Sequence, residues 1–398
     1  MRLVVLGAGY AGLTLARRLE RRLPAADVVV VDESDEHVLR HEIHRAIRRP
    51  AVADAITVPL SEVVDDAEVV VGEVVGVDPE EGRATLADGR TLSWDYGAVC
   101  LGSETATYDI PGVADHATPM KELGHAETVR EAALAAAADG SVEAVVGGAG
   151  LTGVQVAGEL AAFAAEEGVR ADVHLLEQRE DVAPSFPEPF RVAVADALEE
   201  RGVDVHTDTT VEEATDVAVV VDDDSLGSEG RLAYDTFVWA GGIAGPAAVD
   251  GDRPTVRSDL RLGERTFAVG DVARVVDADG EAVPASASAA IREAETAAEN
   301  IVRLATDDGD GWEPRLDAYR FDVPGWIVSV GDGAVAQVGP QVLTGAPARA
   351  LKASVGAGYL TSVRAVENAA DLVREELGHS ADSDDDRPAV LDGGDAGK

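Results

Sequence analysis

The sequence contains a single cysteine, Cys100, among 398 residues. One thiol cannot form an intrachain disulfide, so chemistry that needs a redox-active pair of cysteines within the chain is excluded. Cys100 lies in the apolar run 98–101, where we expect a small buried hydrophobic residue. Because no zinc-type cluster of cysteine and histidine accompanies it, we predict no metal site.

Basic residues are also scarce. The chain has 33 lysines and arginines against 75 acidic residues, a formal charge of −42. Its only lysines are Lys121, Lys352 and Lys398. This balance is typical of a halophilic protein, because salt screens the self-repulsion of so many carboxylates. It disfavours nucleic acid as a partner.

Long hydrophobic runs are missing as well. No apolar stretch reaches the 18 or so residues that a membrane-spanning helix needs. The first residues already form a strand, so we expect no secretory signal. These observations predict a cytoplasmic protein, and peripheral contact with the cytoplasmic face of the cell membrane is the open alternative.

Glycine, in contrast, is frequent and follows a fixed pattern near the N-terminus. Gly7, Gly9 and Gly12 form a GxGxxG motif directly after the apolar strand 3–6. The first glycine makes a tight turn, the second admits a pyrophosphate, and the third lets helix and strand pack closely. The next strand ends in Asp32, 25 residues after Gly7, which is near the spacing of an acid that binds ribose. We call residues 7–12 the first fingerprint.

The same pattern returns later as a second fingerprint, residues 148–153. Gly148, Gly150 and Gly153 follow another apolar strand, and Glu177 ends the next strand 29 residues after Gly148. A carboxylate at that place accepts hydrogen bonds from a free ribose 2′-hydroxyl and repels a 2′-phosphate, which favours NADH over NADPH. Two dinucleotide sites in one chain indicate electron transfer between them.

The two fingerprints predict an α/β fold with two Rossmann-like domains, the second inserted into the first. Smaller features are a hairpin at Asp88-Gly89, later strands of the second unit at 203–206 and 217–221, and a helix at 285–304. The expected domains are 1–118 with 236–310, 119–235, a C-terminal segment 311–377, and an acidic disordered tail 378–398.

The C-terminal segment differs from the rest in charge. Residues 333–366 contain no acidic residue, where the chain average predicts about six. Hydrophobic residues between 351 and 377 follow helical spacing, and the first half of that stretch is basic. Its basic residues are Arg349, Lys352 and Arg364. This predicts one amphipathic helix that contacts an anionic membrane through 346–377. The alternative is packing on the first domain, or on a second subunit in a homodimer.

Four residues that can hold or transfer protons occur in one short stretch: His37, His41, Glu42 and His44. Histidine can donate or accept a proton near neutral pH, so the stretch is a candidate proton relay to a reduced acceptor. On one helix the three histidines would share a face. The alternative interpretation is a polar helix on an acidic surface.

Four stretches resemble one family. They are Leu101-Gly102-Ser103 with Ile110-Pro111-Gly112-Val113, the second fingerprint with Ala157-Gly158-Glu159-Leu160, Trp239-Ala240-Gly241-Gly242, and Phe267-Ala268-Val269-Gly270-Asp271. With the first fingerprint, the chain resembles the two-dinucleotide-binding-domain flavoproteins and, within them, the type II NADH dehydrogenases. The likeness is good over about residues 1–305 and weak beyond them.

The resemblance implies that FAD occupies the first site and NADH the second as an exchanging substrate. In the family, the aspartate at the position of Asp271 holds the ribityl chain. Gly102 and Gly270 would also contact FAD, and Gly241 would contact NADH. A hydride would pass from NADH to the flavin N5, and the electrons would then pass to a quinone.

Three departures from the family pattern concern the electron acceptor. Gln155 stands where the family has a glutamate, and Ser288 and Arg292 replace two glutamines at the quinone site. His41 and Glu42 stand in the family's Pro-Leu-Leu motif. We therefore take Gln155, His41 and Glu42 as candidate catalytic residues. The substitutions keep two alternatives open: a soluble reductase with ferredoxin or a small molecule as acceptor, and a flavin-bearing redox sensor.

Overall fold

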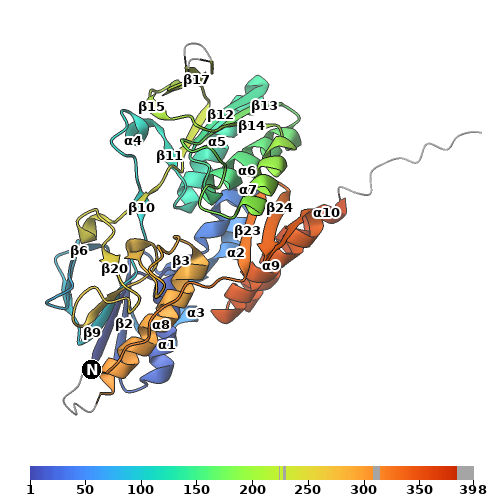
Figure 1. Ribbon diagram of the computed structural model, residues 1–398. Coiled ribbons are helices and arrows are strands. Elements are labelled where there is room, and N and C mark those ends of the chain that lie inside the picture. Colours follow the sequence, from blue (N-terminus) through green and yellow to red (C-terminus); the bar gives the residue numbers. More distant parts are fainter. Residues whose placement is uncertain (224, 227–229, 308–313, 383–398) are drawn as a thin grey trace, which may run out of the picture.

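The first fingerprint directly follows the central strand of a five-stranded parallel sheet. The computed structural model describes residues 1–223, 225–226, 230–307 and 314–382. The first sheet has the order β21-β9-β1-β2-β5 (Figure 1), and all its neighbouring strands run parallel. Its strands are β1 (Arg2–Leu6), β2 (Asp27–Asp32), β5 (Glu68–Val71), β9 (Tyr96–Val99) and β21 (Thr266–Ala268). Because β21 comes from much later in the chain, the backbone leaves this sheet and returns to it.

Two long helices pack side by side on the first sheet (Figure 1). They are α1 (Tyr10–Arg22) and α8 (Ala287–Ala305). Leu13, Leu15 and Leu19 point from α1 into the core, as apolar residues at helical spacing should. On the outer side Arg18 pairs with Glu295 at 3.0 Å, which joins the two helices across the surface.

The second fingerprint directly follows β12, the central strand of a second five-stranded parallel sheet. The order of this sheet is β11-β18-β12-β13-β14. Its strands are β11 (Thr118–Pro119), β12 (Ser141–Gly147), β13 (Arg170–Leu176), β14 (Val203–His206) and β18 (Thr236–Trp239). The helices α5 (Leu123–Asp139), α6 (Leu151–Glu167) and α7 (Glu188–Glu199) pack against its strands. All five strands lie between β9 and β21 in the chain, so the predicted α/β fold with an inserted second unit is confirmed.

Small antiparallel sheets extend both units. The predicted hairpin at Asp88-Gly89 is confirmed by β7 and β8, which pair antiparallel across that turn. The strand predicted at 217–221 is confirmed as β16, which pairs antiparallel with β15 and β17 and lies outside the parallel sheet. These strands are β6 (Val74–Asp78), β7 (Arg83–Leu86), β8 (Thr91–Ser93), β15 (Val211–Ala214), β16 (Ala218–Val221) and β17 (Arg231–Ala233).

Short elements complete the two units. Those between β2 and β5 are β3 (Glu36–Val38), η1 (Arg40–Ile47), α2 (Val52–Ile56), β4 (Thr57–Pro59) and α3 (Leu60–Val63). Near the crossovers and after them lie β10 (Glu104–Thr105), α4 (Val113–His116), β19 (Ile243–Ala244), η2 (Ala247–Val249), β20 (Thr255–Val256), η3 (Gly270–Val272) and β22 (Arg274–Val275).

The histidine-rich stretch is not the single helix that its spacing suggested. His37 lies in β3, and η1 is a 3₁₀-helix that contains His41 and His44. Ile43 and Ile47 are fully buried, and so are the polar Glu42 and His44. Because His37 lies on a separate strand, the three histidines do not form one helical face. The expected polar helix on the surface is therefore wrong.

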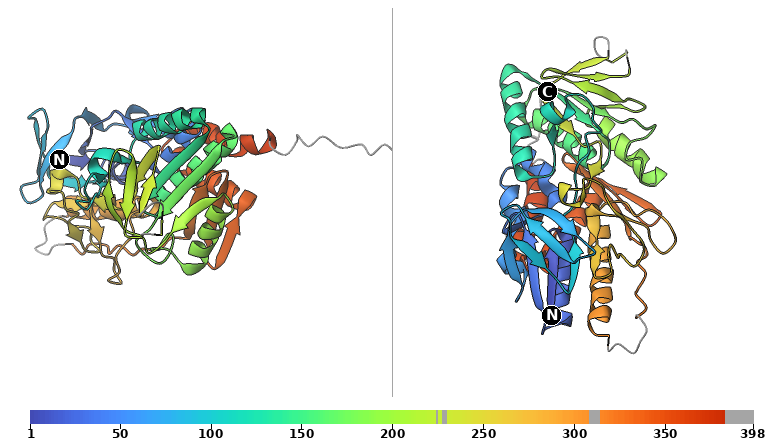
Figure 2. Two further views of the ribbon diagram at one scale, coloured as in Figure 1. Left: turned by 90° about the horizontal axis from the view of Figure 1, so that it is seen from above. Right: turned by 90° about the vertical axis from the view of Figure 1, so that its left-hand side faces the viewer.

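The C-terminal segment packs beside both units, near the level where they meet (Figures 1 and 2). It forms a three-stranded antiparallel sheet and two helices: β23 (Gly325–Val330), β24 (Gly333–Val338), β25 (Gln341–Thr344), α9 (Gly345–Ser362) and α10 (Val366–Asp382). We call β23 and β24 the C-terminal hairpin. The prediction of one continuous helix is wrong, because Arg364 adopts a left-handed φ of 69° that ends α9. Residues 383–398 of the expected acidic tail lie outside the described residues.

The basic residues of this segment pair with acids of the first unit. Lys352 is 5% exposed and bonds to Glu42, and Arg364 bonds to Asp65. Lys352 therefore does not belong to an outward basic face, because its ammonium group is buried against Glu42 of η1. Among the described residues, no helix is both long and apolar enough to cross a membrane.

A buried arginine joins the three parts of the molecule. Arg48 follows η1 and pairs with Glu159 of α6 at 2.8 Å, with Glu166 of α6 at 2.9 Å, and with Asp332 between β23 and β24. Gly158, beside Glu159, admits the backbone of Gly331, where a Cβ atom would lie 2.5 Å from the Gly331 nitrogen. This contact brings α6 directly against the C-terminal hairpin.

Candidate functional site

The first fingerprint has the shape that a pyrophosphate site requires. Gly7 has a φ of 101°, a left-handed value that favours glycine. A Cβ atom on Gly12 would lie 1.8 Å from the Gly7 carbonyl oxygen, so the helix can approach the turn only with glycine there. A Cβ atom on Gly9 would meet no atom within 4 Å, which leaves the entrance to α1 open. No side chain caps α1 and no acid lies in its first turn, so its amide groups are free for an anion.

Asp32 is fixed beside this turn. Its carboxylate accepts hydrogen bonds from the Ala8 amide at 2.6 Å and from the Ser34 amide at 3.1 Å. The carboxylate is therefore oriented next to the helix entrance, where the ribose of a dinucleotide would lie.

The second fingerprint repeats this geometry closely. Gly148 has a φ of 95°, and a Cβ atom on Gly153 would lie 1.9 Å from the Gly148 carbonyl oxygen. The entrance at Gly150 is again open, and α6 also begins without a side-chain cap or an early acid. Glu177 accepts hydrogen bonds from the Ala149 amide at 2.9 Å and from the Arg179 amide at 3.1 Å. The two sites thus share one design, with an acid held by the second residue of each fingerprint.

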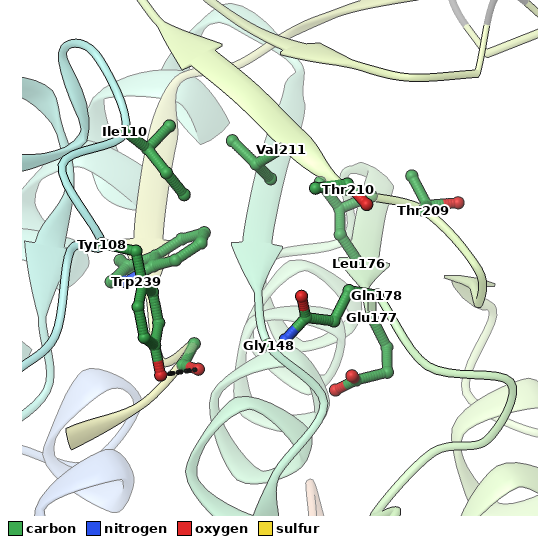
Figure 3. A pocket seen from close by; sticks show the side chains of 11 residues that line it. Tyr108, Ile110, Gly148, Leu176, Glu177, Gln178, Thr209, Thr210, Val211 and Trp239 are labelled. Carbon is green, nitrogen blue, oxygen red and sulfur yellow. Dashed lines mark hydrogen bonds between the residues drawn. The ribbon is translucent and has the colours of Figure 1, made fainter.

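A cavity of about 400 Å³ opens at the second fingerprint (Figure 3). Glu177 and Gln178 line one side of it, and Tyr108 and Trp239 line the opposite side. Leu176, Ile110 and Val211 add apolar surface, and Thr209 and Thr210 add hydroxyl groups. An apolar cavity with a few directed polar groups is typical of a nucleotide site.

The crossovers between the two units shape the same region. A Cβ atom on Gly241 would lie 2.5 Å from the Trp239 ring, so only glycine lets the chain pass behind the indole. The Trp239 indole N–H donates to the Ala106 carbonyl at 2.7 Å, which ties one crossover to the other. Gly102, in the outgoing crossover, also has a left-handed φ of 72°.

Asp271 lies close to the first fingerprint, although it comes from a distant part of the chain. A Cβ atom on Gly270 would lie 3.4 Å from the Ala11 Cβ, which places Gly270 against the first turn of α1. The Gly270 amide donates to Glu293 of α8 at 2.7 Å, and burial raises the pKa of Glu293 to about 7. Within the described residues the Asp271 carboxylate accepts no hydrogen bond, so it is available to a ligand.

The structure brings the three predicted catalytic residues together. The Gln155 side chain on α6 donates to the His41 carbonyl at 3.4 Å. The His41 imidazole lies 3.3 Å from the Glu42 carboxylate. Gln155 also lies 3.5 Å from the Ser329 hydroxyl, which hydrogen-bonds to His44 at 2.7 Å. Residues of both units and of the C-terminal hairpin therefore meet at one place.

Lys352 belongs to this cluster, although the sequence pattern does not place it there. Its ammonium group lies 2.7 Å from the Glu42 carboxylate and 3.5 Å from that of Glu376. Burial alone would raise the pKa of Glu42, but Lys352 and His41 hold it well below its usual range. Glu42 is therefore a buried, ionised carboxylate. The only feature of the sequence that could have drawn attention to Lys352 is the rarity of lysine, since the chain has three.

An aromatic group surrounds the histidines. Tyr10, the first residue of α1, hydrogen-bonds to His41. Tyr359 of α9 hydrogen-bonds to His37 at 2.9 Å, and its ring lies 4.8 Å from that of Tyr10. His37 also bonds to the Ala8 carbonyl at 3.0 Å, and burial lowers its pKa to about 4. His37 is therefore neutral at pH 7 and connects the first fingerprint to α9.

The predicted acceptor residues lie apart from this cluster. Ser288 and Arg292 are both exposed on α8, and neither hydrogen-bonds to Gln155, His41 or Glu42. Cys100 is buried, and burial raises the pKa of its thiol. Within the described residues no group of three His, Cys, Asp or Glu side chains is arranged to hold a metal ion.

Comparison with known proteins identifies the family of the chain. Residues 1–294 match the sequence profile of the pyridine nucleotide-disulphide oxidoreductase family. The type II NADH:quinone oxidoreductase of Staphylococcus aureus (strain NCTC 8325 / PS 47) is 26% identical over 333 residues, which cover 76% of this chain and 82% of that protein.

Solved structures share the fold. NDH2 from Plasmodium falciparum in complex with NADH is similar with a TM-score of 0.80 and 14% identity, over 94% of this chain and 98% of that one. The sulfide:quinone oxidoreductase of Aquifex aeolicus gives a TM-score of 0.76 and 18% identity, over 92% of each chain. At such low identities these structures establish the fold alone.

Proposed function

The chain belongs to the pyridine nucleotide-disulphide oxidoreductase family, and within it we propose an FAD-dependent NADH:quinone oxidoreductase. The observation that carries this proposal is the pair of open, uncapped helix entrances, each with a carboxylate fixed beside it. One chain with two such sites suits a resident and an exchanging dinucleotide. The single cysteine excludes an intrachain dithiol as the intermediate electron carrier.

The first site fits FAD. The amides at the entrance to α1 would bind the pyrophosphate, Asp32 a ribose, and Asp271 the ribityl chain. Gly102 and Gly270 allow the backbone to pass close to it. Bound FAD would supply the group that accepts a hydride from NADH and passes the electrons on.

The second site fits NADH. Glu177 would accept hydrogen bonds from the ribose hydroxyls, and the open entrance at Gly150 would take the pyrophosphate. The Gln155 amide, at the end of the first turn of α6, would orient the nicotinamide or the acceptor. An amide neither gains nor loses a proton near neutral pH, so proton transfer falls to other residues.

We assign proton delivery to His41, with Glu42 as its charged partner. Reduction of a quinone to a quinol takes up two electrons and two protons. The His41 side chain is 36% exposed and contacts Glu42, so it can take a proton from solvent and release it beside the cluster. Glu42 stays ionised and stabilises the protonated imidazole. Tyr10 holds the other ring nitrogen.

Absorption spectroscopy under anaerobic, high-salt conditions tests this function. The purified or FAD-reconstituted protein should show flavin bands that NADH bleaches and a short-chain ubiquinone analogue restores. A protein that binds no FAD would overturn the proposal. Restoration only by ferredoxin or oxygen would favour the soluble-acceptor alternative, and a long-lived bleached complex would favour the sensor. Membrane contact through 346–377 stays a prediction.

Replacement of Glu177 should change the choice of nucleotide. Glu177→Gln removes the charge and keeps one acceptor oxygen. We expect kcat/KM for NADH to fall and that for NADPH to rise, which changes their ratio about tenfold or more, because a charged acceptor is stronger and repels a 2′-phosphate. Glu180→Gln, at an exposed position nearby, is the matched control. An unchanged ratio in Glu177→Gln would contradict the assignment.

Replacement of His41 should slow only the second half of the reaction. Gln at this position can still bond to Tyr10 but cannot transfer a proton. We expect His41→Gln to slow reoxidation by the quinone analogue about tenfold or more, while bleaching by NADH keeps its rate. Stopped-flow spectroscopy measures both steps, with the exposed His116→Gln as control. Equal slowing of both steps would point to a structural role for His41.

A further inference from the structure

Tyr108 occupies an unusual position at the edge of the NADH cavity. It lies in the loop between β10 and α4, is 61% exposed, and has a φ of 54°. Asp109 follows with a φ of 55°. Two successive non-glycine residues in the left-handed region are uncommon, and such conformations concentrate at functional sites. Tyr108 joins none of the hydrophobic clusters among the described residues, so core packing does not account for it.

The loop is anchored immediately before the tyrosine. The Ala106 amide donates to the Gly242 carbonyl at 3.1 Å, and the Ala106 carbonyl accepts from the Trp239 indole at 2.7 Å. The base of the loop is therefore tied to the incoming crossover. Tyr108 follows this anchor by two residues, and its side chain is exposed.

The hydroxyl of Tyr108 is held weakly. It lies 3.5 Å from the Gly241 carbonyl oxygen, at the long limit of a hydrogen bond. Gly242 makes room for it, because a Cβ atom there would lie 2.0 Å from the hydroxyl oxygen. The crossover thus accepts the side chain in this position, and the one hydrogen bond that the side chain makes among the described residues is long.

Across the cavity lie the groups that would bind the dinucleotide. Figure 3 shows the Tyr108 ring on one side and Gly148, Glu177 and Gln178 on the other. Trp239, behind Tyr108, is only 7% exposed and cannot move outward in the same way. A dinucleotide bound to the second fingerprint would therefore lie between this fixed wall and the exposed tyrosine.

We propose that Tyr108 is an aromatic flap that packs its ring on the bound NADH and determines how tightly the dinucleotide is held. The ring closes the solvent side of the cavity once NADH is bound. The weak contact with Gly241 is released when NADH enters the cavity and forms again when NADH leaves. This inference rests on the proposed function, because it concerns the NADH site. Tyr108 is a positioning residue for NADH and has no part in the chemistry.

Two variants of Tyr108 test the flap. Tyr108→Ala should raise KM for NADH and the Kd for NAD⁺ about tenfold, because an aromatic ring stacked on a nucleotide is lost. Tyr108→Phe should stay within about twofold of the parent, since the ring remains. In both variants kcat should stay near that of the parent. Steady-state kinetics and calorimetry with NAD⁺ measure these quantities.

Gly242→Ala displaces the tyrosine without removing it, because the new Cβ atom would occupy the place of the hydroxyl. We expect a rise in KM smaller than that of Tyr108→Ala. In Tyr108→Ala, Gly242→Ala should then add nothing, since the two changes act through one side chain.

The outcomes separate this inference from the proposed function. If the parent protein neither binds NAD⁺ nor is bleached by NADH, the proposed function fails. If the parent does both and Tyr108→Ala has an unchanged or lower KM, the flap is overturned while the function stands. A defect in Tyr108→Phe as large as that of Tyr108→Ala also overturns it, because the hydroxyl would then be responsible.

Discussion

Gly12→Ala is expected to give a folded protein that purifies with less than about a tenth of the parent's flavin and takes up no more when FAD is added. The new Cβ atom would lie 1.8 Å from the Gly7 carbonyl oxygen. The Gly7 backbone cannot move away, because it already packs against the backbone of Cys100: a Cβ atom on Gly7 would lie 2.3 Å from the Cys100 carbonyl oxygen. Helix α1 must therefore retreat from the turn, which removes the amides that would bind the pyrophosphate.

Gly153→Ala is the matched change at the second site. Its Cβ atom would lie 1.9 Å from the Gly148 carbonyl oxygen, so the distortion is nearly the same. We expect this variant to keep its flavin and to be bleached by NADH about a hundredfold more slowly than the parent. Flavin content and stopped-flow bleaching together give the result. If Gly153→Ala loses flavin and Gly12→Ala keeps it, the assignment of FAD to the first site is wrong.

The second large effect concerns stability. Glu42→Gln is expected to lower the free energy of unfolding by about 3 kcal/mol, because it removes the nearest partner of the buried ammonium of Lys352. Glu376 remains 3.5 Å from Lys352 and limits the loss. Chemical denaturation in high salt measures the change.

A double variant isolates the pair. In Glu42→Gln/Lys352→Met the ammonium group that has lost its nearest partner is gone, so we expect the double variant to recover at least half of the loss seen in Glu42→Gln. The exposed pair of Arg374 and Asp371 provides the control, since Asp371→Asn should change stability by less than about 0.5 kcal/mol. Strictly additive losses in the double variant would show that Glu42 and Lys352 do not interact.

The parallel sheets and both dinucleotide sites could be predicted because their signals are local. The turn, the uncapped helix and the acid at the end of the next strand all lie within about 30 residues of each other. Asp32 and Glu177 are each held by an amide of their own fingerprint, so the spacing alone identifies them. In a βαβ unit the second strand lies beside the first, so the carboxylate at its end lies next to the glycine turn.

The catalytic cluster could be predicted only in part. Gln155, His41 and Glu42 stood out as departures from a family pattern, and they do lie together. Lys352 is 310 residues from Glu42, and no periodicity connects them. The apolar spacing of the C-terminal segment was read as one helix, because spacing does not reveal the left-handed conformation of Arg364.

Two further errors have the same origin. The spacing of His37, His41 and His44 suggested a helical face, but β3 and η1 divide the stretch because β3 pairs with β4. Tyr108 gave no signal, since neither its exposure nor its backbone conformation can be read from neighbouring residues. In both cases contacts with other parts of the chain, which neighbouring residues do not reveal, set the local structure.

The buried Arg48 has a consequence for how the molecule can move. An inserted unit is joined to its host by only two crossings of the chain, which alone would allow it to pivot. Arg48 adds a third attachment through Glu159 and Glu166 of the inserted unit, and it also holds Asp332. Rotation of one unit would separate these charges and leave Arg48 buried without partners, which is strongly unfavourable. The Arg48 contacts therefore fix the distance between the two dinucleotide sites. Opening and closing then falls to small elements such as the Tyr108 loop.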